Sequence, residues 1–168
     1  MTDTPFGDQE ETGIQGLPVV IHAQYVKDLS FENPQAPETL RPGLGRPDME
    51  VNIGLEARKI DDPEKKNLYE VVLHTHVNSK RGGMTAFIIE ISYALAVSLD
   101  GMPENQHHSM LLIEMPEYAF PFVRQIIADL THQGGYAPLL LTPVDFKKLY
   151  LDRFANKIDA ATAEKGAA

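Results

Sequence analysis

Four segments of the chain alternate apolar and polar residues with a period of two, at residues 19–32, 48–59, 68–79 and 85–97. In the second segment Met49, Val51, Ile53 and Leu55 all fall on one side. Successive side chains of a strand point to opposite faces, so this period is typical of antiparallel strands with one buried face. We therefore predict four antiparallel strands.

The links between these segments differ in kind. The sequence 79–83 ends in Gly82-Gly83, and adjacent glycines tolerate the positive φ angles of a tight hairpin. Residues 61–66 are polar and predict a second short turn. The link between the first two segments contains Pro34, Pro37 and Pro42 and is too long for a hairpin. We expect it to cross over or to run along the surface.

Beyond residue 100 the apolar period lengthens to that of a helix. A helix is predicted over residues 121–132, with Pro121 in its first turn and Gly134-Gly135 after its end. A second helix is predicted to open with Thr142 as its N-cap. Strands followed by helices predict an α+β fold, a four-stranded antiparallel sheet with helices packed on one face.

The ends of the chain differ from its middle. Residues 1–17 are acidic and polar, and we predict a disordered N-terminal tail. Residues 18–155 form one predicted domain, and residues 156–168, rich in alanine and polar groups, form a predicted flexible C-terminal tail.

Composition narrows the function. The net charge of −9 argues against nucleic-acid binding, which needs Lys and Arg to neutralise phosphates, and suits either a basic partner or simple solubility. The chain has no cysteine, which excludes disulfides and thiolate zinc sites. It has no basic start followed by an apolar leader, and no apolar run near the roughly 20 residues of a membrane span. We expect a cytoplasmic protein that does not insert into a membrane.

Motifs for chemistry are weak. His74 and His76 share a strand face, but without a third ligand at a characteristic spacing a solvated face is the better interpretation than a metal site. His107 and His108 are interpreted as surface histidines of a polar loop. No serine has the strand-turn-helix context of a nucleophile, and no glycine pair matches a phosphate-binding loop. By elimination we predict a binding protein rather than an enzyme, without a metal or cofactor.

The faces of the strands are more informative. In the first segment Asp28, Ser30 and Glu32 share one side, and Lys27, Leu29 and Phe31 share the other. In the fourth segment Ile88, Glu90 and Ser92 share one side, and the apolar row Phe87, Ile89, Ile91 and Tyr93 shares the other.

If the apolar rows face the helices, both acidic rows point outward on the same side of one sheet. Such a face, with Ile88 as an aliphatic spot, could dock a basic segment that carries an apolar anchor. Plain solvation of the acids stays open as the alternative. Because the chain carries more apolar surface than one sheet and two helices can cover, we also expect oligomerisation.

Long runs of the sequence look familiar: QYVKDLSFENP (24–34), LYEVVL (68–73), TAFIIEISYA (85–94) and LLIEMPEYAFPFVRQIIADLTHQGGYAPLLLTPVDFKKLY (111–150). In these runs the sequence resembles the SecB family of bacterial protein-export chaperones, in unbroken order over roughly residues 18–155. The resemblance implies an ATP-independent holdase that binds unfolded secretory precursors, keeps them competent for translocation and delivers them to the motor SecA. It also implies a homotetramer built as a dimer of dimers.

The resemblance further implies site residues. The positions of the family that dock SecA fall on Asp28, Glu32, Ile88 and Glu90. The partner there is the basic, zinc-carrying C-terminal tail of SecA, so any zinc belongs to the partner.

The client groove of the family lies between the crossover after the first strand, the second strand and the last helix. The matching positions in the strand and the helix are Met49, Val51, Ile53, Tyr150 and Phe154. Core packing stays open as the alternative for each of these residues. Phe87, Ile89, Ile91 and Tyr93 are assigned to the core or oligomer face.

The sequence departs from the family pattern at Leu95, where the family usually has glycine, and at Met115, where it usually has cysteine. Leu95 puts the geometry at the end of the fourth strand in question. Two other hypotheses stay open: a related chaperone dedicated to one client, such as the antitoxin of a toxin–antitoxin pair, and a small ligand-binding or enzymatic α+β domain.

Overall fold

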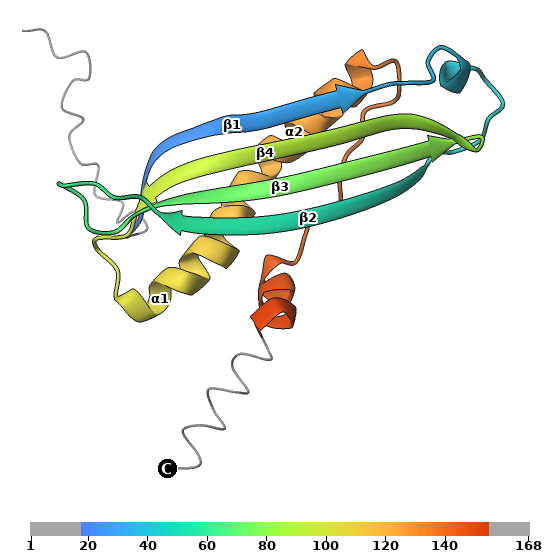
Figure 1. The fold of residues 1–168 in the computed structure, drawn as a ribbon. Coiled ribbons are helices and arrows are strands. Elements are labelled where there is room, and N and C mark those ends of the chain that lie inside the picture. The colour runs from blue at the N-terminus through green and yellow to red at the C-terminus, as the bar shows by residue number, and fades with distance from the viewer. Residues whose placement is uncertain (1–17, 155–168) are drawn as a thin grey trace, which may run out of the picture.

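The computed structural model describes residues 18–154 and contains a four-stranded antiparallel sheet in the order β1-β4-β3-β2 (Figure 1). The strands are β1 (Val20–Glu32), β2 (Asp48–Lys59), β3 (Leu68–Arg81) and β4 (Met84–Ser98). The four predicted strands are confirmed, as is the α+β fold class. The predicted tails, residues 1–17 and 156–168, lie outside the described residues.

The connections follow the predicted scheme. Gly82 and Gly83 have φ angles of 59° and 76° and form the hairpin between β3 and β4. The proline-rich link carries the chain from one edge strand, β1, to the opposite edge strand, β2, with a short 3-10 turn (Glu38–Leu40) on the way. It is therefore a crossover.

The helices lie on one face of the sheet (Figure 1). A helical run of three pieces follows β4: α1 (Glu104–Ser109), a π-helical turn (Met110–Glu114) and α2 (Met115–Gln133). A last helix occupies residues 146–154. The core lies between α2 and the inner face of the sheet, where Phe87, Ile89 and Ile91 meet Val123 and Ile127.

The start of the long helix was predicted wrongly. Pro121 lies inside α2 rather than in its first turn, because the apolar stripe continues upstream through Met115, Ala119 and Phe120, all of them buried. Pro116 has no N–H to donate into the preceding turn, which favours the wider π turn just before α2.

The end of α2 was predicted correctly. Gly135 has a φ angle of 92°, and its amide donates to the His132 carbonyl while the amide of Tyr136 donates to Thr131. This pair of bonds is the Schellman arrangement, in which glycine takes the left-handed position.

The last helix begins later than predicted. Asp145, and not Thr142, is its cap, since Asp145 Oδ1 accepts the backbone N–H of Lys148 at 2.9 Å. Pro143 lies before the helix rather than in its first turn.

The two neighbouring histidines of α1 differ in burial. His107 is buried in α1, with its Nε2 2.9 Å from the carbonyl oxygen of Met102, so the prediction of a surface loop histidine was wrong for His107. His108 is exposed, as predicted, but it lies on α1.

Among the described residues no helix combines the length and the apolarity that crossing a membrane would need.

Leu95 does not interrupt β4. It pairs with Val71 of β3 and Gln24 of β1, and its side chain is buried in the core. Met115 is buried as well, at the start of α2.

The Tyr136 hydroxyl joins the crossover to the sheet. It lies 2.8 Å from Asn33 Oδ1, 3.1 Å from the carbonyl oxygen of Ala86 and 2.8 Å from Thr39 Oγ1. Thr39 is fully buried, so its hydroxyl depends on partners within the protein. The ring of Tyr136 packs on Phe87, with the ring centres 5.0 Å apart.

The variant Tyr136→Phe should lower the free energy of unfolding by about 1–3 kcal/mol, because it removes the hydroxyl's contacts with Asn33 and Ala86 and one of the two partners of the buried Thr39 hydroxyl, which keeps its bond to the Gln35 carbonyl. Urea unfolding at one fixed protein concentration measures the change. The matched control is Tyr69→Phe, which removes a hydroxyl with a single long contact of 3.3 Å to His107. Equal losses in the two variants would contradict this role of Tyr136.

Candidate functional site

The outer face of the sheet, away from the helices, carries the predicted acidic row. Residues that oppose each other on neighbouring strands share a face. Asp28 pairs with Ser92, Ser30 with Glu90, and Glu32 with Ile88. On the other side of β4, these partners pair with His74, His76 and Asn78 of β3. Carboxylates and imidazoles therefore gather on one surface, with Ile88 at one end of it beside Glu32 and Asn78.

This surface is slightly hollowed. A shallow depression of about 400 Å³ lies over it, and its rim includes Asp28, Glu90, His74 and His76. His74 holds the Ser92 hydroxyl at 2.9 Å through Nδ1 and lies 3.3 Å from Glu56 through Nε2. His76 Nε2 lies 3.8 Å from Glu90 Oε1. Within residues 18–154, no three His, Asp or Glu side chains are grouped so that they could hold a metal ion.

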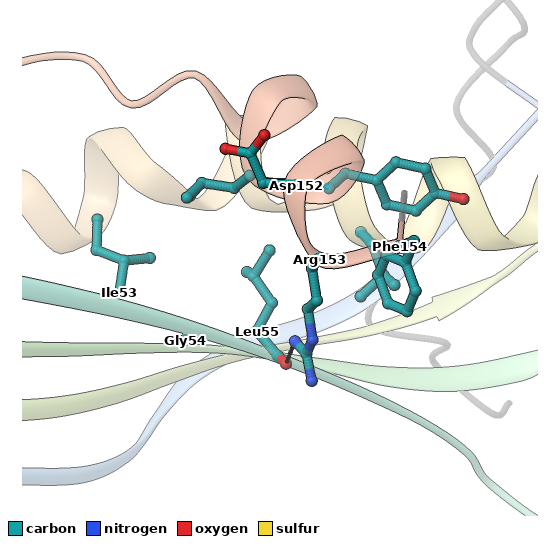
Figure 2. Close-up of a pocket in the computed structure, with 9 residues that line it drawn as sticks. Ile53, Gly54, Leu55, Asp152, Arg153 and Phe154 are labelled. Atoms are coloured by element: carbon teal, nitrogen blue, oxygen red, sulfur yellow. Dashed lines mark hydrogen bonds between the residues drawn. The ribbon is translucent and has the colours of Figure 1, made fainter. Parts of the chain in front are cut away.

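An apolar groove lies on the other side, between β2 and the last helix. It contains a cavity of about 350 Å³, lined by Ile53, Leu55, Leu112, Tyr150 and Phe154 among others. Figure 2 shows Arg153 reaching from the helix to β2, where its Nη1 donates to the carbonyl oxygen of Leu55 at 2.8 Å. A second hollow of about 350 Å³ continues along Leu55, Leu112 and Phe154 towards α1.

Aromatic contacts hold the helix side of the groove. Phe154 packs against His108 of α1 and against Tyr150, with ring centres 4.8 Å and 5.0 Å apart. The Tyr150 hydroxyl lies 2.7 Å from His108 Nδ1. The groove is thus closed on one side by a short helix, which Arg153 joins to β2 and Tyr150 joins to α1.

Comparison with known proteins identifies the family. The family model described as "Preprotein translocase subunit SecB" matches residues 13–157. The chain belongs to the SecB family.

Curated relatives agree with this assignment. The chain is 43% identical over 163 residues to the protein-export protein SecB of Rhodospirillum centenum, covering 94% of this chain and 95% of the relative. It is 42% identical over 161 residues to the protein of the same name from Maricaulis maris, covering 96% and 91%.

Among solved structures, the fold is similar to that of the SecB-like chaperone of Mycobacterium tuberculosis, in complex with a peptide of the antitoxin HigA1. The TM-score is 0.61 at 15% identity, over 75% of this chain and 90% of that one. At this identity the likeness concerns the fold alone.

The predicted docking residues of the SecB family lie together. Asp28, Glu32 and Glu90 are exposed on the outer face, and Ile88 is half-buried among them. One neighbour was assigned to the wrong face. Lys27 does not lie with Leu29 and Phe31, because β1 carries an extra residue there and the Lys27 side chain reaches Glu70.

The predicted client residues do not all line the same hollow. Ile53, Tyr150 and Phe154 line the groove. Met49 lines a separate hollow of about 360 Å³ with Phe87 and residues 135–139. Val51 is exposed on β2, on the same strand face as Met49 and Ile53.

The predicted core or oligomer row is buried within this chain. Phe87, Ile89, Ile91 and Tyr93 belong to the hydrophobic core, and Tyr93 stacks on Phe122 at 6.1 Å. The large apolar side chains that stay exposed include a group on β1 and α2: Val20, Val26, Leu29, Tyr118 and Phe122.

Sequence reasoning missed Glu70. Its side chain is only 3% exposed, on the outer face of β3, and accepts hydrogen bonds from Tyr25 at 2.5 Å, Lys27 at 2.9 Å and Arg58 at 2.6 Å. Burial alone would raise the pKa of this carboxyl, but the bonds from Tyr25, Lys27 and Arg58 outweigh it and lower the pKa to about 2. A lone acid inside the apolar run 68–73 was the available signal.

The variant Glu70→Gln should be less stable than the wild type near pH 7, because it removes the charge that Lys27 and Arg58 bind. The loss should be on the order of 2 kcal/mol and no larger, since both charged partners are half-exposed and screened by solvent. The lowered pKa stabilises the folded state above about pH 4.5, and this share is lost as the pH falls towards about 2. The difference between the two proteins should therefore shrink over that range. Urea unfolding at a series of pH values measures it. A difference that does not change with pH would contradict the role of the charge.

Proposed function

We propose that this chain is an ATP-independent holdase of the Sec pathway. It binds unfolded secretory precursors, keeps them competent for translocation and delivers them to the motor SecA. The observation that carries the proposal is the division of one sheet into an acidic outer face and an apolar groove on the helix side, in a chain of the SecB family.

Client capture is assigned to the groove. Ile53, Tyr150 and Phe154 offer apolar surface that an unfolded chain can cover, at about 25 cal/mol per Å² buried. Aromatic side chains on a short helix can repack around different sequences, which suits a binder of many clients. Met49 and Val51 extend this surface along β2. Several grooves in one assembly would add avidity along a long client.

Delivery is assigned to the outer face. Glu32 and Glu90 flank Ile88 and Asp28 lies farther along the same face, so a basic segment with an apolar anchor matches the surface in charge and in apolar character. The basic, zinc-carrying tail of SecA is the proposed occupant, and its zinc belongs to SecA.

The proposed assembly is a homotetramer, a dimer of dimers. Support comes from the apolar side chains that one chain leaves exposed, on the edge strand β1 and on α2. We place the protein in the cytoplasm, where precursors await export, and propose that it acts by binding without catalysis. A chaperone dedicated to one antitoxin is not favoured, because the relatives at 42–43% identity are export proteins and the antitoxin-bound structure shares only the fold.

The variant Phe154→Ala should weaken binding of an unfolded precursor by about tenfold, because it removes an aromatic wall of the groove. Fluorescence anisotropy of a labelled, unfolded precursor measures the affinity. The control is Leu151→Ala on the same helix, a side chain that is 46% exposed and does not line the groove. If both variants bind as the wild type does, capture occurs elsewhere.

The variant Glu90→Lys should weaken the SecA complex by about tenfold or more, because it places a cation on the surface that meets a basic partner. Size-exclusion chromatography with light scattering measures both the complex and the tetramer. Glu64→Lys, in the exposed turn 61–66, changes the net charge equally and is the control. Client binding should survive in both variants.

Three results would count against the proposal. A stable monomer indifferent to SecA would overturn the assembly and the delivery step together. Loss of both client and SecA binding in a well-folded Glu90→Lys protein would contradict the separation of the two surfaces. An unchanged SecA complex would remove the outer face from delivery.

A further inference from the structure

The outward orientation of the acidic row depends on one extra residue in β1. Tyr25 pairs with Ala94 and Asp28 pairs with Ser92, and these two residues of β4 share the outer face. Tyr25 and Asp28 are three positions apart, so strict alternation would put them on opposite faces. They share a face only because the register shifts between Val26 and Asp28, where Lys27 has no partner on β4.

Without this bulge, and with Tyr25 kept in place, Asp28, Ser30 and Glu32 would point towards the helices. A one-residue change of register moves every following side chain to the other face. Burying three polar side chains in an apolar core is costly, so the fold strongly favours a strand that contains the bulge. A further interaction is then required to keep the bulge at its position between Val26 and Asp28.

Glu70 supplies that restraint. A residue just before the register shift and the unpaired residue within it both reach this carboxylate: Tyr25 Oη at 2.5 Å and Lys27 Nζ at 2.9 Å. Glu70 stands on β3, so these bonds cross β4, where the small residues Ala94 and Ala96 face the same side. The Glu70 side chain is 3% exposed, so water competes little for it.

We propose that Glu70 is a positioning residue for the docking surface: by holding Tyr25 and Lys27 it fixes the β1 bulge and so presents Asp28 and Glu32 outward. The inference rests on the proposed function, because a basic partner is what needs the acids in this place. Glu70 itself does not touch the partner.

The sign of the effect at Lys27 separates positioning from plain electrostatics. Removing the Lys27 charge makes the outer face more negative, and if only the field mattered a basic partner would bind more tightly. If Lys27 holds the bulge, the same change displaces Asp28 and weakens binding. Arg58 offers a matched control, since it also bonds Glu70, at 2.6 Å, but from β2 and away from the bulge.

The test compares Lys27→Met, Arg58→Met and Lys27→Arg in the full chain. Binding of purified SecA is measured by calorimetry, and hydrogen exchange of the β1 amides is measured in the free protein. Lys27→Met should weaken SecA binding by about fivefold or more and speed exchange over residues 27–32. Arg58→Met should do neither, and Lys27→Arg should restore both. Both substituted positions, 27 and 58, carry half-exposed side chains, so the three variants are expected to fold.

Tighter or unchanged SecA binding by Lys27→Met would overturn the proposal, as would unchanged exchange in β1. Equal effects of Lys27→Met and Arg58→Met would reduce Glu70 to a general stabiliser of the sheet. If the wild type itself fails to bind SecA, the proposed function fails, but the exchange measurement needs no partner and still decides whether Glu70 fixes the bulge.

Discussion

Each side chain of a strand has to point to one of two faces, and the register between β1 and β4 decides which. Here that choice separates chemistry as well as burial. Ile89 and Ile91 of β4 pack under α2, while Glu90 between them meets solvent on the outer face. The register of the strands therefore sets the positions of the acids and of the core residues together, and neither can change without the other.

The two surfaces are built with different tolerances. On the outer face, Ile88 and Glu90 lie on the central strand β4, and the register of the edge strand β1, with its bulge, places Asp28 and Glu32 beside them. The groove is walled by the edge strand β2 and by a short helix held through Arg153 and Tyr150, and this is the surface proposed to adapt to different clients. A rigid surface suits one partner and an adaptable one suits many. This difference fits the proposed role, in which varied clients are held and passed to a single receiver.

The sequence predicted what depends on repeating patterns. Alternation located all four strands, including the bounds of β2, and the glycine pair marked the end of α2. It failed where one local interaction overrides the pattern. An inserted residue in a strand has no signature of its own, so the face of Lys27 was wrong until its contact with Glu70 was visible. A buried histidine bonded to a carbonyl, such as His107, looks the same in sequence as an exposed one.

The central claim is that docking and capture use opposite sides of one sheet. Hydrogen exchange of the protein bound to an unfolded precursor, to SecA, and to both tests it most directly. The account predicts that SecA slows exchange in residues 28–32 and 88–90, that the precursor slows it in residues 49–55 and 146–154, and that the two patterns add when both are bound. Protection of the same segments by both ligands, or displacement of one by the other, would contradict it.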